Sequence, residues 1–229
     1  MMFEDDIIVA DGWMAKTRHA LNIVATNSRD TTGKFWNWVY LRLFYTETAM
    51  SWENEDFWYY HMWLTFALAS LAGLGSLLAL RRYSAPTKRH LDDFTIGAIC
   101  IVTIPAFVAL LFMCGKYSIF PPSTVFTLNQ HGCCTQGLLF PRPQIPDLIK
   151  YLEERGHGQT DSMIEDYANR DGKQRLAMGK QLVQHVGLTS SRDNTFVNSQ
   201  STWAFWFETY DVQTLRTEKD QLRRRLGTV

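Results

Sequence analysis

The sequence predicts an α/β domain that is interrupted by a hairpin of two membrane-spanning helices. Two apolar runs, at 57–80 and 94–115, contain no Asp, Glu, Lys or Arg. Segments with the alternation of strands and the spacing of helices occur on both sides of these runs. We therefore expect three parts: the first part of the domain at 1–56, the hairpin at 57–115 and the remainder of the domain at 116–229.

Each apolar run is long enough to cross a bilayer as an α-helix. At a rise of about 1.5 Å per residue, about 20 apolar residues cross a hydrocarbon core of about 30 Å. A helix also satisfies its own backbone hydrogen bonds, which lipid cannot do. The alternative is a buried helical hairpin in a soluble protein. It is disfavoured because soluble core helices rarely run this long without a charge.

Charges and aromatic residues at the ends of the runs predict the orientation of the hairpin. The connecting loop, 81–93, carries four cations, namely Arg81, Arg82, Lys88 and Arg89. The approach to the first run is acidic, with Glu47, Glu53, Glu55 and Asp56. Lys and Arg beside a span stay in the cytosol, and Trp and Tyr gather at the interface. We therefore expect a cytosolic loop and luminal flanking segments.

Three elements are predicted before the hairpin. Residues 1–10 have the pattern of a strand that contains an acidic triplet, Glu4-Asp5-Asp6. Residues 13–25 have helical spacing. The aromatic and apolar segment 34–50 is compatible either with an interfacial segment or with a core strand and helix.

The remainder of the chain alternates between strand-like and helix-like segments. In order they are a strand at 124–128, a glycine-containing loop at 131–137, a helix at 147–154 that ends near Gly156, a helix capped by Thr160-Asp161, a strand at 182–191 containing His185, a strand-like aromatic segment at 203–207, and a charged helix or tail at 218–226.

The acidic triplet is the strongest local indication of chemistry. Carboxylates at a bend in a hydrophobic strand are costly unless a cation or hydrogen-bond donors satisfy them. Hard divalent cations such as Mg²⁺ and Mn²⁺ take carboxylate oxygens as ligands. The triplet therefore indicates either a metal site or an acidic surface turn. A lone His near a strand end, such as His185, is more often a hydrogen-bonded core residue than a ligand.

The overall charge argues against a nucleic-acid partner. The chain has 23 Lys and Arg and 23 Asp and Glu residues, so it lacks the net positive charge that binds phosphate backbones. The adjacent Cys133 and Cys134 are expected in the lumen, where disulfides can form, but their pairing stays open.

Four motifs occur in one order along the chain: Glu4-Asp5-Asp6, then 41–45, the loop 132–137 and the strand segment 184–191. With the hairpin between them, they resemble the post-GPI-attachment GalNAc-transferase family, which is similar to the N-glycan GlcNAc-transferase IV group. The resemblance covers essentially all of the chain and implies the C-terminal part of a GT-A glycosyltransferase domain. That family has a membrane anchor and a first half-domain upstream of the triplet, so we expect the chain to be part of a longer protein.

The resemblance also implies a function. It is that of a multi-pass Golgi enzyme with luminal catalytic segments, which transfers GalNAc from UDP-GalNAc to the mannose core of GPI anchors with inversion. The implied partners are the UDP-sugar donor, the GPI glycan acceptor and the lipid bilayer. One alternative is an N-glycan-type GlcNAc transferase, which needs no internal hairpin. The other is a non-catalytic membrane protein that retains part of the fold.

The family resemblance assigns expected roles to individual residues. Asp6 is expected to bind Mn²⁺ or Mg²⁺ directly, with His185 as a second ligand or a phosphate contact. Glu4 and Asp5 are expected on ribose, sugar or ordered water. The loop glycines Gly132 and Gly137 are expected beside the donor. An inverting enzyme needs a carboxylate to deprotonate the acceptor hydroxyl, and the candidates are Asp161, Glu165 and Asp166.

The orientation of the hairpin can be tested with a glycosylation acceptor sequence placed at Ser84. It should stay unmodified in intact cells, because the basic loop is predicted to lie in the cytosol. The same acceptor placed near Gly156, in a segment predicted to be luminal, should be glycosylated. Glycosylation at Ser84 would show that the loop is luminal, which would contradict the predicted topology and the luminal position of both flanking segments.

Overall fold

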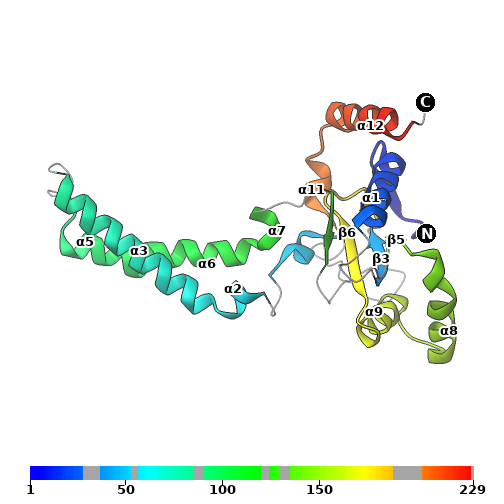
Figure 1. Cartoon of the computed structure of the whole chain (residues 1–229), viewed down its shortest axis with the longest axis horizontal. Coiled ribbons are helices and arrows are strands. Elements are labelled where there is room, and N and C mark those ends of the chain that lie inside the picture. The colour runs from blue at the N-terminus through cyan, green and yellow to red at the C-terminus, as the bar shows by residue number, and fades with distance from the viewer. Residues whose placement is uncertain are drawn as a thin grey trace. The chain divides into compact units, whose positions relative to one another are not determined.

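The computed structural model describes residues 1–27, 37–52, 56–84, 90–119, 124–128, 135–187 and 203–227. These residues belong to two compact units (Figure 1). The sheet unit comprises Met1–Ala49 and Pro121–Val229, and the hairpin unit comprises Met50–Phe120.

The sheet unit contains a mixed five-stranded sheet. Its strand order is β1 (Met2–Phe3), β5 (Gly137–Leu139), β3 (Trp38–Arg42), β6 (Gln174–Met178) and β4 (Val125–Thr127). The central pair β3–β6 is parallel, and the other three pairings are antiparallel. Strands β1, β3 and β6 therefore run in one direction. This mixture of helices and strands is compatible with the predicted α/β class.

A second, two-stranded sheet joins distant parts of the chain. Strand β2 (Ile7–Val9) pairs antiparallel with β7 (Val183–His185), and Ile7 lies opposite His185. The backbone N–H of Val186 donates to the carbonyl of Asp6 over 2.8 Å. The end of the acidic triplet is thereby brought beside His185.

Helices cover both faces of the larger sheet. The helices of the sheet unit are α1 (Trp13–Asn27), α8 (Ile145–Arg155), α9 (Thr160–Arg170), α11 (Phe205–Glu208) and α12 (Val212–Leu226), with 3₁₀ turns η1 (Glu47–Met50) and η3 (Arg142–Gln144). Successive side chains of a strand point to opposite faces. Leu41 of β3 packs with Ala20 of α1, whereas the preceding Tyr40 packs with Ile164 of α9.

An ionic network is buried on the face that α9 covers. Glu165 of α9 accepts a hydrogen bond from the Tyr40 hydroxyl over 2.6 Å and forms ion pairs with Arg42, at 3.2 Å, and Arg175. The side chains of Arg42 and Arg175 are only 4% and 5% exposed. Burial raises the pKa of the Tyr40 hydroxyl well above its ordinary value, so this group stays protonated and donates a hydrogen bond to Glu165.

Several predicted elements of the sheet unit are confirmed, and three need correction. Of the two alternatives for 34–50, the described part contains a buried strand followed by a 3₁₀ turn. Strand β6 has no counterpart in the sequence prediction, because 174–178 contains no β-branched or aromatic residue. The aromatic segment 203–207 is not a strand: α11 begins at Phe205 after Ala204. The N-cap of α9 is Gln159, one residue before the predicted Thr160-Asp161 cap.

The hairpin unit contains two apolar helices of 22 residues each, and both are long and apolar enough to cross a membrane by length and composition. The first is α3 (Met62–Tyr83), and the second is a continuous helix formed by α5 (Asp93–Ala98), the π-helical segment η2 (Ile99–Thr103) and α6 (Ile104–Cys114). Short helices, α2 (Phe57–Tyr60) and α7 (Lys116–Ile119), flank them. Figure 1 shows α3 and α6 side by side.

The two long helices bury little of their apolar surface against each other. Gly73 of α3 lies so near the second helix that a Cβ there would approach Cδ1 of Ile104 to 2.2 Å. Large apolar side chains elsewhere on both helices are exposed, including Leu68, Leu71, Leu78, Ile101, Val102, Phe107, Leu110 and Met113. An exposed apolar surface of this extent is unfavourable in water and is typical of a surface that lipid or another protein covers.

The two long helices extend into both ends of the predicted loop, 81–93. Arg81 belongs to the last turn of α3 and forms an ion pair with Asp93, the first residue of α5. Cations are favourable at a helix C-terminus because unsatisfied carbonyl groups point out there. Arg82 also belongs to the last turn of α3, and the remaining two cations of the predicted loop, Lys88 and Arg89, lie outside the described residues.

The buried network predicts a large effect of Glu165→Ala on stability. Removing this carboxylate leaves two buried arginines without their shared partner, which typically costs about 3–5 kcal/mol of unfolding free energy. The control is Glu154→Ala on neighbouring helix α8, where an exposed pair with Lys150 at 3.9 Å should contribute about 0.5 kcal/mol or less. Unfolding in denaturant, followed by circular dichroism in detergent, measures both. Equal losses in the two variants would contradict a structural role for Glu165.

Candidate metal centre

The candidate site forms where the acidic triplet passes between two strands. Residues 4–6 make a bend between β1, which pairs with β5, and β2, which pairs with β7. Because both strands are paired, the backbone on each side of the bend is held in place. Glu4 and Asp6 therefore project from a fixed frame rather than from an open loop.

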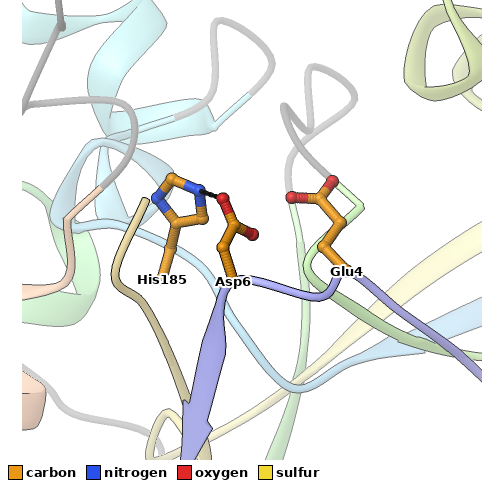
Figure 2. Close-up of side chains that lie close together, drawn as sticks. All are labelled: Glu4, Asp6 and His185. Carbon is orange, nitrogen blue, oxygen red and sulfur yellow. Dashed lines mark hydrogen bonds and ion pairs between the residues drawn. The ribbon is translucent and has the colours of Figure 1, made fainter. Parts of the chain in front are cut away.

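Three side chains gather at this bend. Nε2 of His185 lies 3.0 Å from Oδ2 of Asp6, and Glu4, Asp6 and His185 each offer one ligand atom within 4.8 Å of the others. Figure 2 shows Glu4 and Asp6 projecting from the N-terminal strand segment and His185 from the neighbouring strand. The Asp6 side chain is 40% exposed and that of His185 is 11% exposed, so the cluster can be reached from solvent at the carboxylate end.

One atom of the cluster lacks a partner. Oδ1 of Asp6 is buried and accepts no hydrogen bond from the residues that the structure describes. A carboxylate oxygen without donors is costly to bury, and a cation satisfies it. Two carboxylates and an imidazole form a donor set that suits a divalent first-row metal, since imidazole nitrogen binds Mn²⁺ better than it binds Mg²⁺ or Ca²⁺. The residues present therefore fit a divalent metal ion, and Mn²⁺ is one such ion.

A glycine makes this arrangement possible. Gly187 follows His185 by two residues, and a Cβ at this position would lie 2.1 Å from Oδ2 of Asp6 and 2.9 Å from Nε2 of His185. Both distances are far below van der Waals contact. Any other residue at 187 would push the two candidate ligands apart, so the cluster requires the glycine for space.

The cluster lies at a position in the sheet that commonly binds ligands. Phe44 follows the carboxyl end of β3, and its ring centroid is 6.4 Å from that of His185. Thr135 precedes β5 and donates a hydrogen bond from its hydroxyl to Oε1 of Glu4 over 2.6 Å. In α/β sheets, ligands bind outside the carboxyl ends of parallel strands. The parallel pair β3–β6 ends on this side.

The other residues predicted beside the donor have different surroundings. Asp5 is exposed in the bend and is not part of the three-residue cluster. Gly137 is buried in β5, where a Cβ would meet Leu43 and Val183 at 3.3 Å, so packing of the sheet explains this glycine. A contact of Asp5 or Gly137 with a donor stays a prediction. Gly132, with Cys133 and Cys134, lies outside the described residues.

The three candidate bases all lie on α9, but in different settings. Asp161 is half-buried in the first turn of the helix, and its carboxylate accepts a hydrogen bond from the backbone N–H of Ser162 over 2.8 Å. Asp166 forms a surface ion pair with Arg155 at 3.0 Å. The oxygens of Glu165 are held by the buried network, so we set Glu165 aside as a base. Asp161 remains the best candidate of the three.

The buried ionic network and the core beside the β2–β7 ladder lie on opposite faces of the larger sheet. Ile7 of β2 and Val183 of β7 pack with the core on the α1 face, whereas Glu165 binds side chains on the α9 face. Glu165 therefore lies on the other face of the larger sheet from this core. Glu165 is not part of the Glu4–Asp6–His185 cluster.

Two residues of the site were not identifiable as such from sequence. Gly187 and Thr135 both lie in motifs that carry the family resemblance, but nothing in their residue type indicates contact with the triplet. Thr135 is separated from Glu4 by 131 positions. Only the pairing of the strands places these residues beside one another.

Comparisons with protein-family models, curated proteins and solved structures found no match to this chain.

The space requirement at Gly187 predicts that Gly187→Ala weakens Mn²⁺ binding. A Cβ at this position displaces Asp6 or His185, and misplacing a ligand typically costs about 10–100-fold in metal affinity. Gly156→Ala is the comparison, because the structure describes no atom within 4 Å of a Cβ there, although its φ of 77° adds backbone strain. Electron paramagnetic resonance of free Mn²⁺ during titration measures the affinity. An unchanged Mn²⁺ affinity in Gly187→Ala would contradict a metal site formed by Asp6 and His185 together.

Proposed function

We propose that the chain is part of a membrane-bound, metal-dependent glycosyltransferase. The observation that carries the proposal is the Glu4–Asp6–His185 cluster at the carboxyl end of a parallel strand pair, in which Oδ1 of Asp6 has no hydrogen-bond partner among the described residues. Support also comes from the family resemblance of the motifs that meet there. That resemblance narrows the proposal to GalNAc transfer from UDP-GalNAc to the mannose core of GPI anchors, with inversion at the anomeric carbon.

In this proposal the cluster holds the cation that would neutralise the leaving group. Asp6, Glu4 and His185 would hold a divalent cation, which would supply a Lewis acid for the charge on the departing diphosphate. Asp6 and Glu4 provide the negative charge that holds the cation in place. His185 is held by Asp6 on one side and lies beside the Phe44 ring on the other. This packing restricts the orientation of the imidazole.

Transfer with inversion also requires a base. The acceptor hydroxyl attacks the anomeric carbon, the bond from that carbon to the phosphate oxygen breaks, and the hydroxyl proton passes to a carboxylate. By the family resemblance alone we assign that carboxylate to Asp161, which is half-buried and is not part of the buried ionic network. UDP leaves with the electron pair of the broken bond.

The hairpin unit supports a membrane location. Its two helices have the length and composition of membrane spans, and they expose large apolar side chains. We propose that they span the Golgi membrane with the sheet unit in the lumen, as the basic loop predicts. An enzyme whose acceptor glycan is attached to lipid benefits from being held at the same membrane.

The proposal predicts that Asp6→Asn and Asp161→Asn fail in different ways. Asp6→Asn removes a charged ligand, so Mn²⁺-dependent binding of UDP-GalNAc should weaken together with turnover. Asp161→Asn leaves the cation site intact, so binding should persist while turnover falls by about 10²–10⁴-fold. The measurement is donor titration in the presence of Mn²⁺ beside the transfer rate to a GPI-type acceptor, with the full protein in nanodiscs.

Asp166→Asn is the matched control on α9, because it removes only an exposed ion pair and should change neither quantity. His185→Ala should follow the pattern of Asp6→Asn. Near-parent turnover in Asp161→Asn would place the base elsewhere. If Asp6→Asn kept both affinity and rate, the acidic triplet would be only a surface bend, and the proposal would lose its main support.

A further inference from the structure

Thr135 makes the closest described contact with Glu4. Its hydroxyl oxygen lies 2.6 Å from Oε1 of Glu4, which is short for a hydrogen bond between oxygen atoms. Thr135 and Glu4 are both half-buried. An ionised carboxylate can only accept hydrogen bonds, so the threonine hydroxyl must be the donor.

The backbones of both partners are held by one pair of strands. Glu4 follows Phe3 of β1, and Thr135 precedes Gly137 of β5 by two residues. Phe3 and Gly137 lie opposite each other in the β1–β5 ladder. The hydrogen bond therefore connects two fixed points, and its main effect is on the Glu4 side chain, which otherwise has three rotatable bonds and a large rotamer entropy to lose.

The hydrogen bond at one carboxylate oxygen of Glu4 also limits the positions that the other oxygen can take. With Oε1 bound to the Thr135 hydroxyl, rotation of the carboxylate is restricted, and Glu4 offers a ligand atom within 4.8 Å of those of Asp6 and His185. Figure 2 shows the Glu4 carboxylate on the same side of the bend as the other two groups. A free glutamate in a solvent-accessible bend would spend much of its time turned away from them.

We propose that Thr135 is a positioning residue of the cation site, and that its hydroxyl holds Glu4 in the orientation that binds a divalent metal. The inference rests on the proposed function and deepens it by assigning a role to a residue in the segment before β5. It acts only through Glu4. Groups of this kind, one step away from the metal, typically change metal affinity by about 10–100-fold when they are removed.

Two variants of Thr135 separate the role of the hydroxyl from that of the methyl group. Thr135→Val keeps the branched shape and loses the donor, whereas Thr135→Ser keeps the donor and loses the methyl group. We expect Thr135→Val to weaken Mn²⁺ binding by about tenfold or more, and Thr135→Ser to bind Mn²⁺ nearly as tightly as the parent. Affinity is measured on the full protein in nanodiscs by electron paramagnetic resonance with Mn²⁺ alone, and thermal unfolding without metal checks the fold.

A double-mutant cycle with Glu4→Ala tests the route of the effect. If Thr135 acts through Glu4, Thr135→Val should weaken Mn²⁺ binding much less in the Glu4→Ala background than in the parent. Parent-like affinity in Thr135→Val, equal losses in the Val and Ser variants, or full additivity with Glu4→Ala each overturns the assignment while leaving the metal centre in place. A parent protein that binds no Mn²⁺ overturns the proposed function, and the role of Thr135 with it.

Discussion

The candidate site depends on the pairing of β2 with β7. This short ladder joins the first ten residues to a strand that lies about 175 positions later, and Val183 at one end of the ladder is fully buried. Closing a loop of that length costs entropy that grows only slowly with its size. Burial of the apolar residues beneath the ladder offsets this cost. The same pairing places Asp6 beside His185, so the fold and the cluster form together.

The two faces of the larger sheet differ in the chemistry of their buried side chains. On the α9 face, Glu165 neutralises two buried arginines, and such a network is costly to break because an unpaired buried charge would remain. The α1 face is a mainly apolar core that supports the β2–β7 ladder. Acidic residues close together in sequence on α9 thus have different surroundings: a buried ion pair for Glu165, a surface ion pair for Asp166 and a hydrogen bond from the Ser162 backbone N–H for Asp161.

The hairpin unit and the sheet unit differ in how far they bury their apolar side chains. Its helices leave large apolar side chains exposed, while the sheet unit buries Tyr40, Leu41 and Leu43 completely. A protein in water buries its apolar groups because exposing them is unfavourable. The contrast within one chain indicates two different surroundings for its two parts.

The sequence alone determined the elements whose signal is local. Helical periodicity and uncharged length predicted α1, α8, α9 and the two long helices, because each pattern repeats within one element. Tertiary structure decided the rest. Strand β6 is a strand because it is buried between β3 and β4, not because of its residue types. Sequence also supplied candidate ligands by resemblance, but contacts such as Thr135 with Glu4 and the space at Gly187 join positions more than 130 residues apart. No local pattern encodes such contacts, since they exist only after the strands have paired.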